Sequence, residues 1–192
     1  MPQLSCEEGV VSLPGRPLLE RAVPAGFPSP AADYYEGRLS LDEHLIESLR
    51  QLRPADRYLE LVHRLDRDTS GAMVVAKTKA AQLHLVSQFK GRRMLKKYLV
   101  LAQGSPLSTE GAIDAPIGRH PKDRKRMAVV EGGRPSRTLY EVTRRFNGYS
   151  EVEATLQTGR THQIRVHFSH KGWPVVWDAV YGVKVPWLGR QF

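Results

Sequence analysis

The sequence contains a single cysteine, Cys6, among its 192 residues. It therefore cannot form an internal disulfide, and it lacks the cysteine cluster that zinc sites and iron–sulfur centres need. No apolar run approaches the roughly 18 residues of a membrane-spanning segment, and the first residues lack the basic start and apolar stretch of a signal peptide. These absences predict a protein of the reducing cytoplasm that does not enter a membrane.

Acidic residues are outnumbered, with 20 Asp and Glu against 29 Lys and Arg, so the formal net charge is +9. This surplus of positive charge suits a polyanionic partner such as nucleic acid. Apolar residues make up 41% and charged residues 26% of the chain, as in globular proteins, which excludes disorder throughout. The length suits one domain with a sizeable core, so we expect a single domain over residues 1–192, acting as a monomer.

Three segments have helical character and five have strand character. Residues 1–38 contain six prolines and predict extended segments and loops. Ser40 and Glu43 form a capping box ahead of leucines at helical spacing, which predicts a helix over 41–52 that Pro54 stops. Further helices are expected over 79–90 and 160–171. Strands are expected over 59–62, 72–76, 96–102, 138–146 and 149–157.

The last two strands flank Asn147-Gly148, a pair that favours a tight hairpin in which both turn residues have positive φ. Interleaved helices and strands with one firm antiparallel hairpin predict an α+β fold with a mixed sheet. Residues 119–137 form a basic loop or a hairpin with a flexible tip. Its candidates for contacting the nucleic acid backbone are Arg119, Lys122, Arg124, Lys125 and Arg126.

The first polar insert, residues 63–71, reads His-Arg-Leu-Asp-Arg-Asp-Thr-Ser-Gly between two apolar segments. One interpretation is a solvated turn in which Asp–Arg pairs contribute about 0–1 kcal/mol each. The other is a loop that leaves the core directly and holds reactive groups on a rigid base. The residues of the insert alone leave both interpretations open.

The second polar insert, residues 158–167, reads Thr-Gly-Arg-Thr-His-Gln-Ile-Arg-Val-His. On a half-buried helix face, Arg165 needs a carboxylate partner, because its charge cannot be removed. His162, His167 and His170 are more readily explained as ordinary polar or core histidines than as metal ligands. No carboxylate or cysteine with convincing ligand spacing accompanies them, so we expect no metal site.

Together these inserts resemble the RluA-type RNA pseudouridine synthases. The residues that carry the resemblance are His63 to Asp66, Thr69 to Gly71, Lys97-Tyr98, Thr158 to His167, Pro174 to Val176, Asp178 and Tyr181-Gly182. They cover most of residues 60–182 in the order that the family has. Two long motifs in the right order are far more specific than either motif alone.

The resemblance implies a mixed, mainly antiparallel sheet with flanking helices and a central cleft. It implies isomerisation of uridine to its C5-glycoside in ribosomal or transfer RNA, with no metal or organic cofactor. Asp66 is then the catalytic carboxylate, Tyr98 stacks on the target base, Arg165 pairs with Asp66, and Arg64 helps displace the base. The other residues expected to bind substrate are His63, Arg160, Thr161, His162 and Gln163, and the five basic residues named above would contact the RNA backbone.

The chain departs from the family pattern at three places. Val23-Pro24-Ala25-Gly26 lacks the lysine of the usual Lys-Pro-Ala-Gly, and Trp177-Asp178 stands where the family tends to have Gly-Asp. The sequence stops at Phe192, where the family normally continues with a Leu-His-Ala segment and further strands that complete the cleft. We therefore expect a single catalytic domain that lacks these strands and has no N-terminal S4-type module.

Two other functions compete with this one. A degenerate member of the same fold would hold RNA without chemistry, and would differ only in whether Asp66 turns over. A glycosidase using Asp66 and Asp68 would need two carboxyl groups about 5–10 Å apart across a sugar. Residues i and i+2 of one loop seldom supply that separation, so the hydrolase is the weakest of the three hypotheses.

Overall fold

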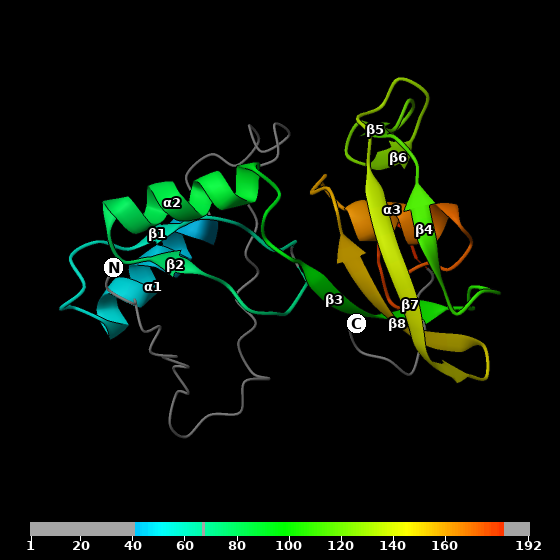
Figure 1. The fold of residues 1–192 in the computed structure, drawn as a ribbon, viewed down its shortest axis with the longest axis horizontal. Coiled ribbons are helices and arrows are strands. Elements are labelled where there is room, and N and C mark those ends of the chain that lie inside the picture. Colours follow the sequence, from blue (N-terminus) through cyan, green and yellow to red (C-terminus); the bar gives the residue numbers. More distant parts are fainter. Residues whose placement is uncertain (1–40, 67, 183–192) are drawn as a thin grey trace, which may run out of the picture.

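The computed structural model describes residues 41–66 and 68–182. The expected extended segment 1–38, the capping residue Ser40, the Val23–Gly26 motif and the chain end after 182 lie outside the described residues. Two parts follow one another along the chain (Figure 1): helices around a short ribbon, then a four-stranded sheet that carries a helix and a small hairpin. No helix in the described ranges is long and apolar enough to cross a membrane.

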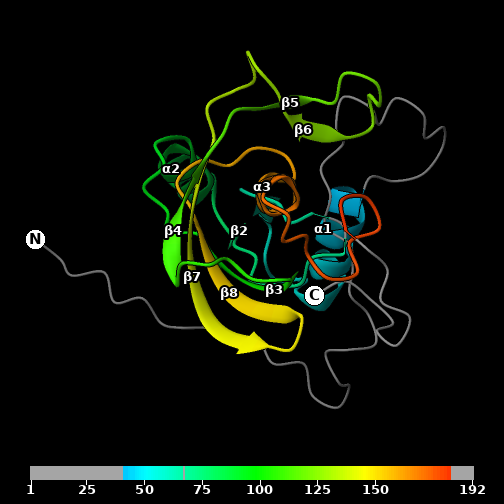
Figure 2. The same cartoon turned by 90° about the vertical axis from the view of Figure 1, so that its right-hand side faces the viewer.

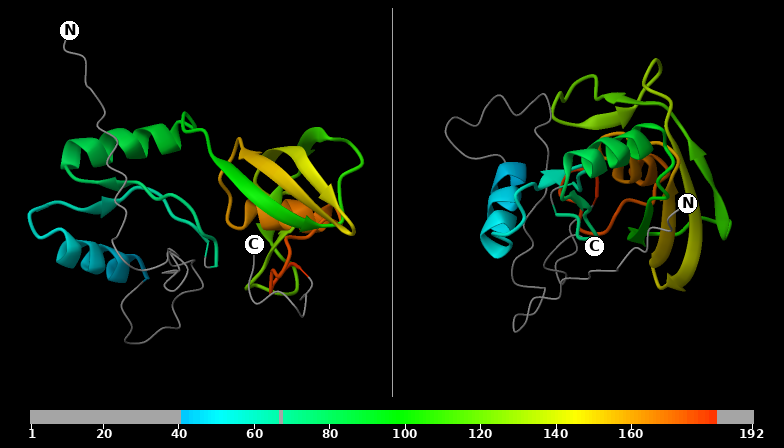
Figure 3. Two further views of the ribbon diagram at one scale, coloured as in Figure 1. Left: turned by 90° about the horizontal axis from the view of Figure 1, so that it is seen from below. Right: turned by 60° about the vertical axis from the view of Figure 1, so that its left-hand side comes forward.

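The first part consists of α1 (Leu41–Leu52), β1 (Glu60–Leu61), β2 (Val75–Ala76) and α2 (Lys79–Lys90). β1 pairs antiparallel with β2, and the two helices lie on opposite sides of this ribbon (Figure 3). Both helices have the bounds that the sequence predicts. α2 begins where Thr78 Oγ1 accepts a hydrogen bond from the Ala81 amide at 3.1 Å, and it ends at Gly91.

The apolar face of α1 differs from the expected row of leucines. Ile46 is the buried side chain among residues 45–52, whereas Leu52 is 61% exposed. The strands expected over 59–62 and 72–76 are also shorter than predicted, because only two residues of each pair. The long connection between them is the first polar insert, which is therefore a loop that leaves and re-enters a minimal ribbon.

The second part is built on a sheet of order β3-β8-β7-β4, with β3 (Lys97–Gln103), β4 (Glu110–Asp114), β7 (Arg137–Phe146) and β8 (Tyr149–Leu156). Alternate residues of β3 and β8 contribute to the core, among them Val100, Ala102, Val152 and Ala154. They pack on Phe168 of α3 (Gln163–His170), around which the sheet curves (Figure 2). Every strand pairing among the described residues is antiparallel, and the α+β class is confirmed.

The basic segment 119–137 contains a real hairpin, β5 (Ile117–Arg119) with β6 (Met127–Val129), at one end of the sheet. The β7–β8 hairpin is also present, but only Gly148 of its turn has positive φ, so the expectation for Asn147 is wrong. β4 was not predicted. Its five residues have an acid at each end and a glycine in second place. This composition hides the alternation of apolar and polar residues that is typical of a strand.

α3 begins three residues later than predicted, because His162 has a left-handed φ of 56°. His167 of this helix is a core histidine. Its Nδ1 lies 2.9 Å from Thr138 Oγ1 and its Nε2 lies 3.0 Å from the Ala115 carbonyl oxygen. Burial is the main cause that lowers the pKa of His167, so the ring is neutral and donates from Nε2 to the carbonyl.

Candidate active site

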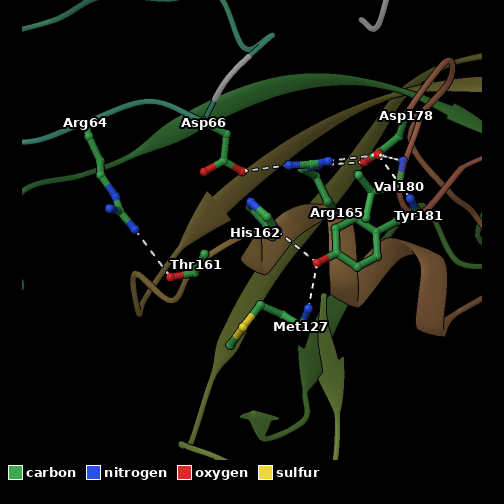
Figure 4. Close-up of polar contacts among 9 residues, drawn as sticks. All are labelled: Arg64, Asp66, Met127, Thr161, His162, Arg165, Asp178, Val180 and Tyr181. Carbon is green, nitrogen blue, oxygen red and sulfur yellow. Dashed lines mark hydrogen bonds and ion pairs between the residues drawn. The ribbon is translucent and has the colours of Figure 1, made fainter. Parts of the chain in front are cut away.

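Arg165 of α3 is the centre of the polar cluster in Figure 4. Its Nε donates to Asp178 Oδ2 at 2.6 Å and its Nη2 donates to Asp178 Oδ1 at 2.9 Å, a two-pronged ion pair. The Asp178 side chain is 0% exposed and that of Arg165 is 11% exposed. The sequence predicted a carboxylate partner for Arg165, but its closest partner is Asp178, which was not among the predicted site residues.

Four donated hydrogen bonds hold the Asp178 carboxylate. Besides the two from Arg165, the amides of Val180 and Tyr181 donate to Oδ1 at 2.9 and 3.1 Å. Burial alone would raise the pKa of Asp178, but the Arg165 guanidinium and the two amides outweigh it and leave that pKa below its usual value. Asp178 is therefore ionised and immobile, and it fixes the orientation of Arg165.

Asp66 lies on the opposite side of the same guanidinium. Arg165 Nη1 donates to Asp66 Oδ2 at 3.4 Å, and the Asp66 side chain is 25% exposed. Its Oδ1 makes no hydrogen bond with any residue in the described ranges. Arg165 thus joins a buried structural carboxylate to a second carboxylate that keeps one oxygen accessible.

The loop that carries Asp66 is anchored rather than free. Leu65 is buried, and the Asp66 carbonyl accepts a hydrogen bond from the Thr69 amide at 3.0 Å. His63 Nε2 accepts from the Val74 amide at 2.8 Å, and the His63 ring stacks on Phe89 with centroids 4.9 Å apart. Of the two interpretations of residues 63–71, the structure favours the loop that holds side chains on a rigid base.

Tyr98 of β3 packs against the core cluster on the inner side of the sheet. Burial, and after it the negative charge of Asp66, raises the pKa of the Tyr98 phenol. The phenol is therefore protonated at neutral pH, and it lies within the electrostatic reach of Asp66. The structure thus brings Asp66, Tyr98 and Arg165, the three predicted catalytic residues, into one region.

The predicted base-displacing residue also reaches the second insert. Arg64 Nη2 donates to Thr161 Oγ1 at 3.4 Å, so the loop 63–71 contacts the segment 158–167 at Thr161 and at Arg165. Arg160 lies beside this contact, with its guanidinium donating to the Pro135 carbonyl at 3.2 Å through Nη2. The two inserts, almost a hundred residues apart in sequence, form one site.

Tyr181 connects three parts of this site, although no role was predicted for it from the sequence. Its hydroxyl accepts from the Met127 amide at 2.8 Å and lies 2.8 Å from His162 Nδ1. Its ring lies under the guanidinium of Arg165, 5.0 Å from Cζ to the centroid. Burial is the main cause that lowers the pKa of His162. The neutral imidazole can therefore accept a hydrogen bond from the Tyr181 hydroxyl at Nδ1 and carry its own proton on Nε2.

Trp177 precedes Asp178 in a left-handed conformation, with φ of 62°. Such a conformation costs a residue other than glycine about 1–2 kcal/mol. The turn that delivers Asp178 to Arg165 therefore suits glycine, the residue that the family pattern tends to have there.

Gln163, one of the predicted substrate-binding residues, is buried and hydrogen-bonded within the protein. It is 2% exposed, and its amide group forms the hydrogen bonds. Oε1 accepts from Thr158 Oγ1 at 2.7 Å and from the Arg160 amide at 3.0 Å. Nε2 donates to the Arg137 carbonyl and to Thr138 Oγ1, both at 3.0 Å. With both of its donors and two acceptor positions occupied, Gln163 braces the 158–162 turn and has no hydrogen left for a substrate.

We expect Gln163→Leu to destabilise the fold by about 3 kcal/mol or more, because it strands several buried polar partners at once. Gln157→Leu is the matched control, since Gln157 is exposed, and its effect should stay within about 0.5 kcal/mol. Urea unfolding followed by circular dichroism measures both. Equal stability of the two variants would mean that the Gln163 network does not hold the turn.

The basic hairpin docks beside the site. Arg119, Lys122, Arg124 and Lys125 are exposed, and Arg119 Nη1 donates to the Arg124 carbonyl at 2.8 Å, which closes the tip. Arg126 differs from them, because its guanidinium lies over the Tyr181 ring with Cζ 5.2 Å from the centroid. Four of the five predicted backbone-binding residues therefore face solvent, and the fifth contacts the Tyr181 side of the site.

The remaining acidic residue of the insert, Asp68, is exposed and has a left-handed φ of 73°. Within residues 41–66 and 68–182, no group of three or more His, Cys, Asp or Glu side chains is arranged to hold a metal ion. The chemical groups that meet in the site are thus a partly exposed carboxylate, a fixed guanidinium, a phenol and a second arginine. This set can bind an anionic, base-bearing substrate and can supply one carboxylate to it.

Comparison with known proteins gives the same reading. Residues 24–170 match the family described as RNA pseudouridylate synthase. An uncharacterised RNA pseudouridine synthase of Chloroflexus aurantiacus is 54% identical over 144 residues, covering 74% of this chain and 44% of that protein. Ribosomal large subunit pseudouridine synthase D of Nitrosomonas europaea is 50% identical over 66% of this chain and 36% of its own length. Synthase C of Vibrio parahaemolyticus is 40% identical over 80% of this chain and 48% of its own length.

Solved structures agree. Human RNA pseudouridylate synthase domain containing 1 superposes with a TM-score of 0.67 at 34% identity, over 75% of this chain and 64% of that one. Human RNA pseudouridylate synthase domain containing 4 gives 0.63 at 28% identity, over 79% and 62%. The chain spans less than half the length of the three curated relatives named above. The resemblance seen in the two inserts is confirmed, and the chain belongs to the RNA pseudouridylate synthase family.

Proposed function

We propose that this chain isomerises specific uridines to pseudouridine in ribosomal RNA, with Asp66 as the catalytic carboxylate. The observation that carries the proposal is the chain of charges from Asp178 through Arg165 to Asp66. A buried ion pair fixes one end, and the other end presents a carboxylate oxygen with no protein partner in the described ranges. Ribosomal RNA is preferred to transfer RNA because the named relatives are ribosomal large subunit synthases.

The reaction breaks the bond between C1′ and N1, turns the uracil, and forms a bond between C1′ and C5. N1 gains a proton and C5 loses one, so atoms and charge balance without a cofactor. Asp66 acts either as a nucleophile on the sugar or base, or in removal of the C5 proton. Arg165 holds the carboxylate in place, and Tyr98 provides an aromatic surface for the base.

The target nucleotide must leave its stack, which costs a few kcal/mol. Arg64 leaves the loop two residues before Asp66 and reaches Thr161 across the site. In this proposal it takes the position that the base vacates. In Figure 4, the side chains of Thr161 and His162 lie between those of Arg64 and Tyr181. His63 and Arg160 serve this arrangement indirectly, through their contacts with Val74 and Pro135. The cytoplasmic location and the monomeric state stay predictions.

The direct test uses the purified chain and bulk cellular RNA labelled with tritium at uracil C5. Isomerisation releases this tritium to water, so the target need not be known. Release above that of a boiled sample is the expected result. RNA binding without release would contradict the proposal and favour the degenerate, non-catalytic member of the fold.

The exposed face of the basic hairpin should govern the salt dependence of RNA binding. We expect the triple variant Lys122→Gln, Arg124→Gln and Lys125→Gln to bind RNA more weakly. The slope of log K against log salt should fall by about 2, because binding releases fewer counterions when it makes fewer phosphate contacts. Arg126 is left in place because it packs on Tyr181. The control changes Lys77 and Lys79, which are exposed on the first part of the chain, and should retain the parent slope. An unchanged slope in the triple variant would show that the hairpin does not touch RNA.

A further inference from the structure

Lys96 is a half-buried cation that has no counterion among the residues described by the structure. Its side chain is partly covered, yet Nζ makes no hydrogen bond or ion pair with any residue of the described ranges. Lys97, the next residue, is exposed and pairs with Glu153 at 2.5 Å. Removing an ammonium from water without a partner is unfavourable, so Lys96 calls for an explanation that Lys97 does not.

The position of Lys96 is fixed by the sheet. It immediately precedes β3, and its carbonyl accepts from the Leu156 amide at 2.9 Å. Side chains two residues apart on a strand leave the same face, about 6.5 Å from each other. Lys96 therefore lies on the face of Tyr98, toward the site, and Lys97 lies on the opposite face.

The Lys96 ammonium lies next to Gly159 of the second polar insert. A methyl group built on Gly159 would stand 2.9 Å from Lys96 Nζ, so the absence of a side chain at Gly159 makes room for the cation. This glycine immediately precedes Arg160 and Thr161, the residue that receives Arg64. Lys96 thus borders the site between the two inserts.

The charged groups around Lys96 are positive. Burial, and then the charge of Arg92, lowers the pKa of Lys96, and no carboxylate contributes to this shift. The charge of Lys96 in turn contributes to lowering the pKa of His63, after burial. Neighbouring positive charges of this kind attract an anion from outside the protein.

We propose that Lys96 Nζ binds a phosphodiester group of the RNA strand, next to the nucleotide that lies between Asp66 and Tyr98. The inference rests on the proposed function, since it takes the substrate to be RNA. A lysine ammonium suits a phosphate because it is a compact charge with three donors. Lys96 and Tyr98 are next neighbours on the same face of the strand. A phosphate bound by Lys96 would therefore lie beside a base that stacks on Tyr98, and not beneath that base.

The test compares Lys96→Gln with Lys97→Gln as the matched control. Binding of a short single-stranded oligouridylate is measured over a range of KCl concentrations. We expect Lys96→Gln to bind about tenfold more weakly and to reduce the slope of log K against log salt by about 0.7, while Lys97→Gln keeps the parent values. The melting temperature of Lys96→Gln should be no lower than that of the parent, because no internal partner is lost.

Neutral phosphate probes give the second arm. A single methylphosphonate, moved along the oligouridylate one position at a time, should weaken binding to the parent at one position at which Lys96→Gln is insensitive. If both lysine variants behave alike, or if Lys96→Gln melts well below the parent, the phosphate site is contradicted while the proposed function stands. Inorganic phosphate that binds the parent but not Lys96→Gln, with RNA binding unchanged in Lys96→Gln, would assign the site to a free anion and contradict the phosphodiester site. A parent chain that binds no RNA would contradict the proposed function as well.

Discussion

Replacing Asp66 by asparagine should abolish tritium release from uracil C5 while leaving RNA affinity within a few-fold of the parent. The Asp66 carboxylate keeps an oxygen that no described residue occupies. Asparagine has nearly the same shape but can neither attack carbon nor accept a proton at neutral pH. Its amide can still lie beside Arg165, so the fold should survive the change.

The size of the loss separates the two roles open to Asp66. A group that only transfers a proton contributes about 10²–10⁴-fold. A nucleophile that forms a covalent intermediate contributes more, and its removal leaves no parallel route. Single-turnover assays with excess enzyme measure this loss without interference from product release.

Asp68→Asn is the control, because it removes the same charge from the same loop. Asp68 is exposed and has a left-handed backbone, a conformation that asparagine tolerates well. Its activity should stay near that of the parent. An active Asp66→Asn enzyme, or equal losses of activity in the two variants, would contradict the assignment of Asp66 as the catalytic carboxylate.

Secondary structure was predicted best where local chemistry decides it. α2 begins at a threonine cap and ends at a glycine, and both bounds are as expected. The β7–β8 hairpin follows from Asn147-Gly148. The start of α3 was missed because helical periodicity runs through His162 and Gln163 alike. The left-handed φ of His162 and the hydrogen bonds that Thr158 and Arg160 donate to Gln163 separate the 158–162 turn from the helix.

The sequence led to Arg64, Asp66 and Arg165 of the cluster in Figure 4, but it did not lead to Asp178 or Tyr181. The resemblance, and not spacing, joined Asp66 to Arg165 across almost a hundred residues. The sequence around Asp178 resembles that of any acid in a turn. Its importance comes from complete burial and from the two hydrogen bonds that Arg165 of α3 adds to those of the local Val180 and Tyr181 amides. Tyr181 was hidden for the same reason, since its partners belong to β6, the turn before α3 and α3 itself.

Asp178→Asn should destabilise the fold by about 3–5 kcal/mol, because it leaves Arg165 buried opposite a neutral amide. The asparagine oxygen can still accept from Val180 and Tyr181, so the loss is mainly that of the charge. Asp114→Asn is the control. Asp114 and Arg137 are also paired, at 3.9 Å, but their side chains are 68% and 50% exposed, and such a pair contributes less than about 1 kcal/mol. Urea unfolding at neutral pH should separate the two variants clearly.

Acid should reveal the same interaction. The pKa of Asp178 is lower in the folded protein than its ordinary value, so its contribution is complete above about pH 4, the unfolded value, and is lost as pH falls through the folded value. Stability of the parent should therefore fall more steeply below about pH 4 than that of Asp178→Asn. Parallel curves for the two proteins would show that Asp178 is not ionised in the fold.

A double variant separates stability from positioning. Arg165→Met combined with Asp178→Asn removes both charges and keeps the acceptor for the two amides. Because an apolar replacement of a buried ion pair is often neutral, it should recover most of the stability lost in Asp178→Asn alone. It should not recover tritium release, since Asp66 then has no guanidinium to hold it. If activity returned with stability, Arg165 would serve the fold only, and the chain of charges from Asp178 to Asp66 would have no part in the chemistry.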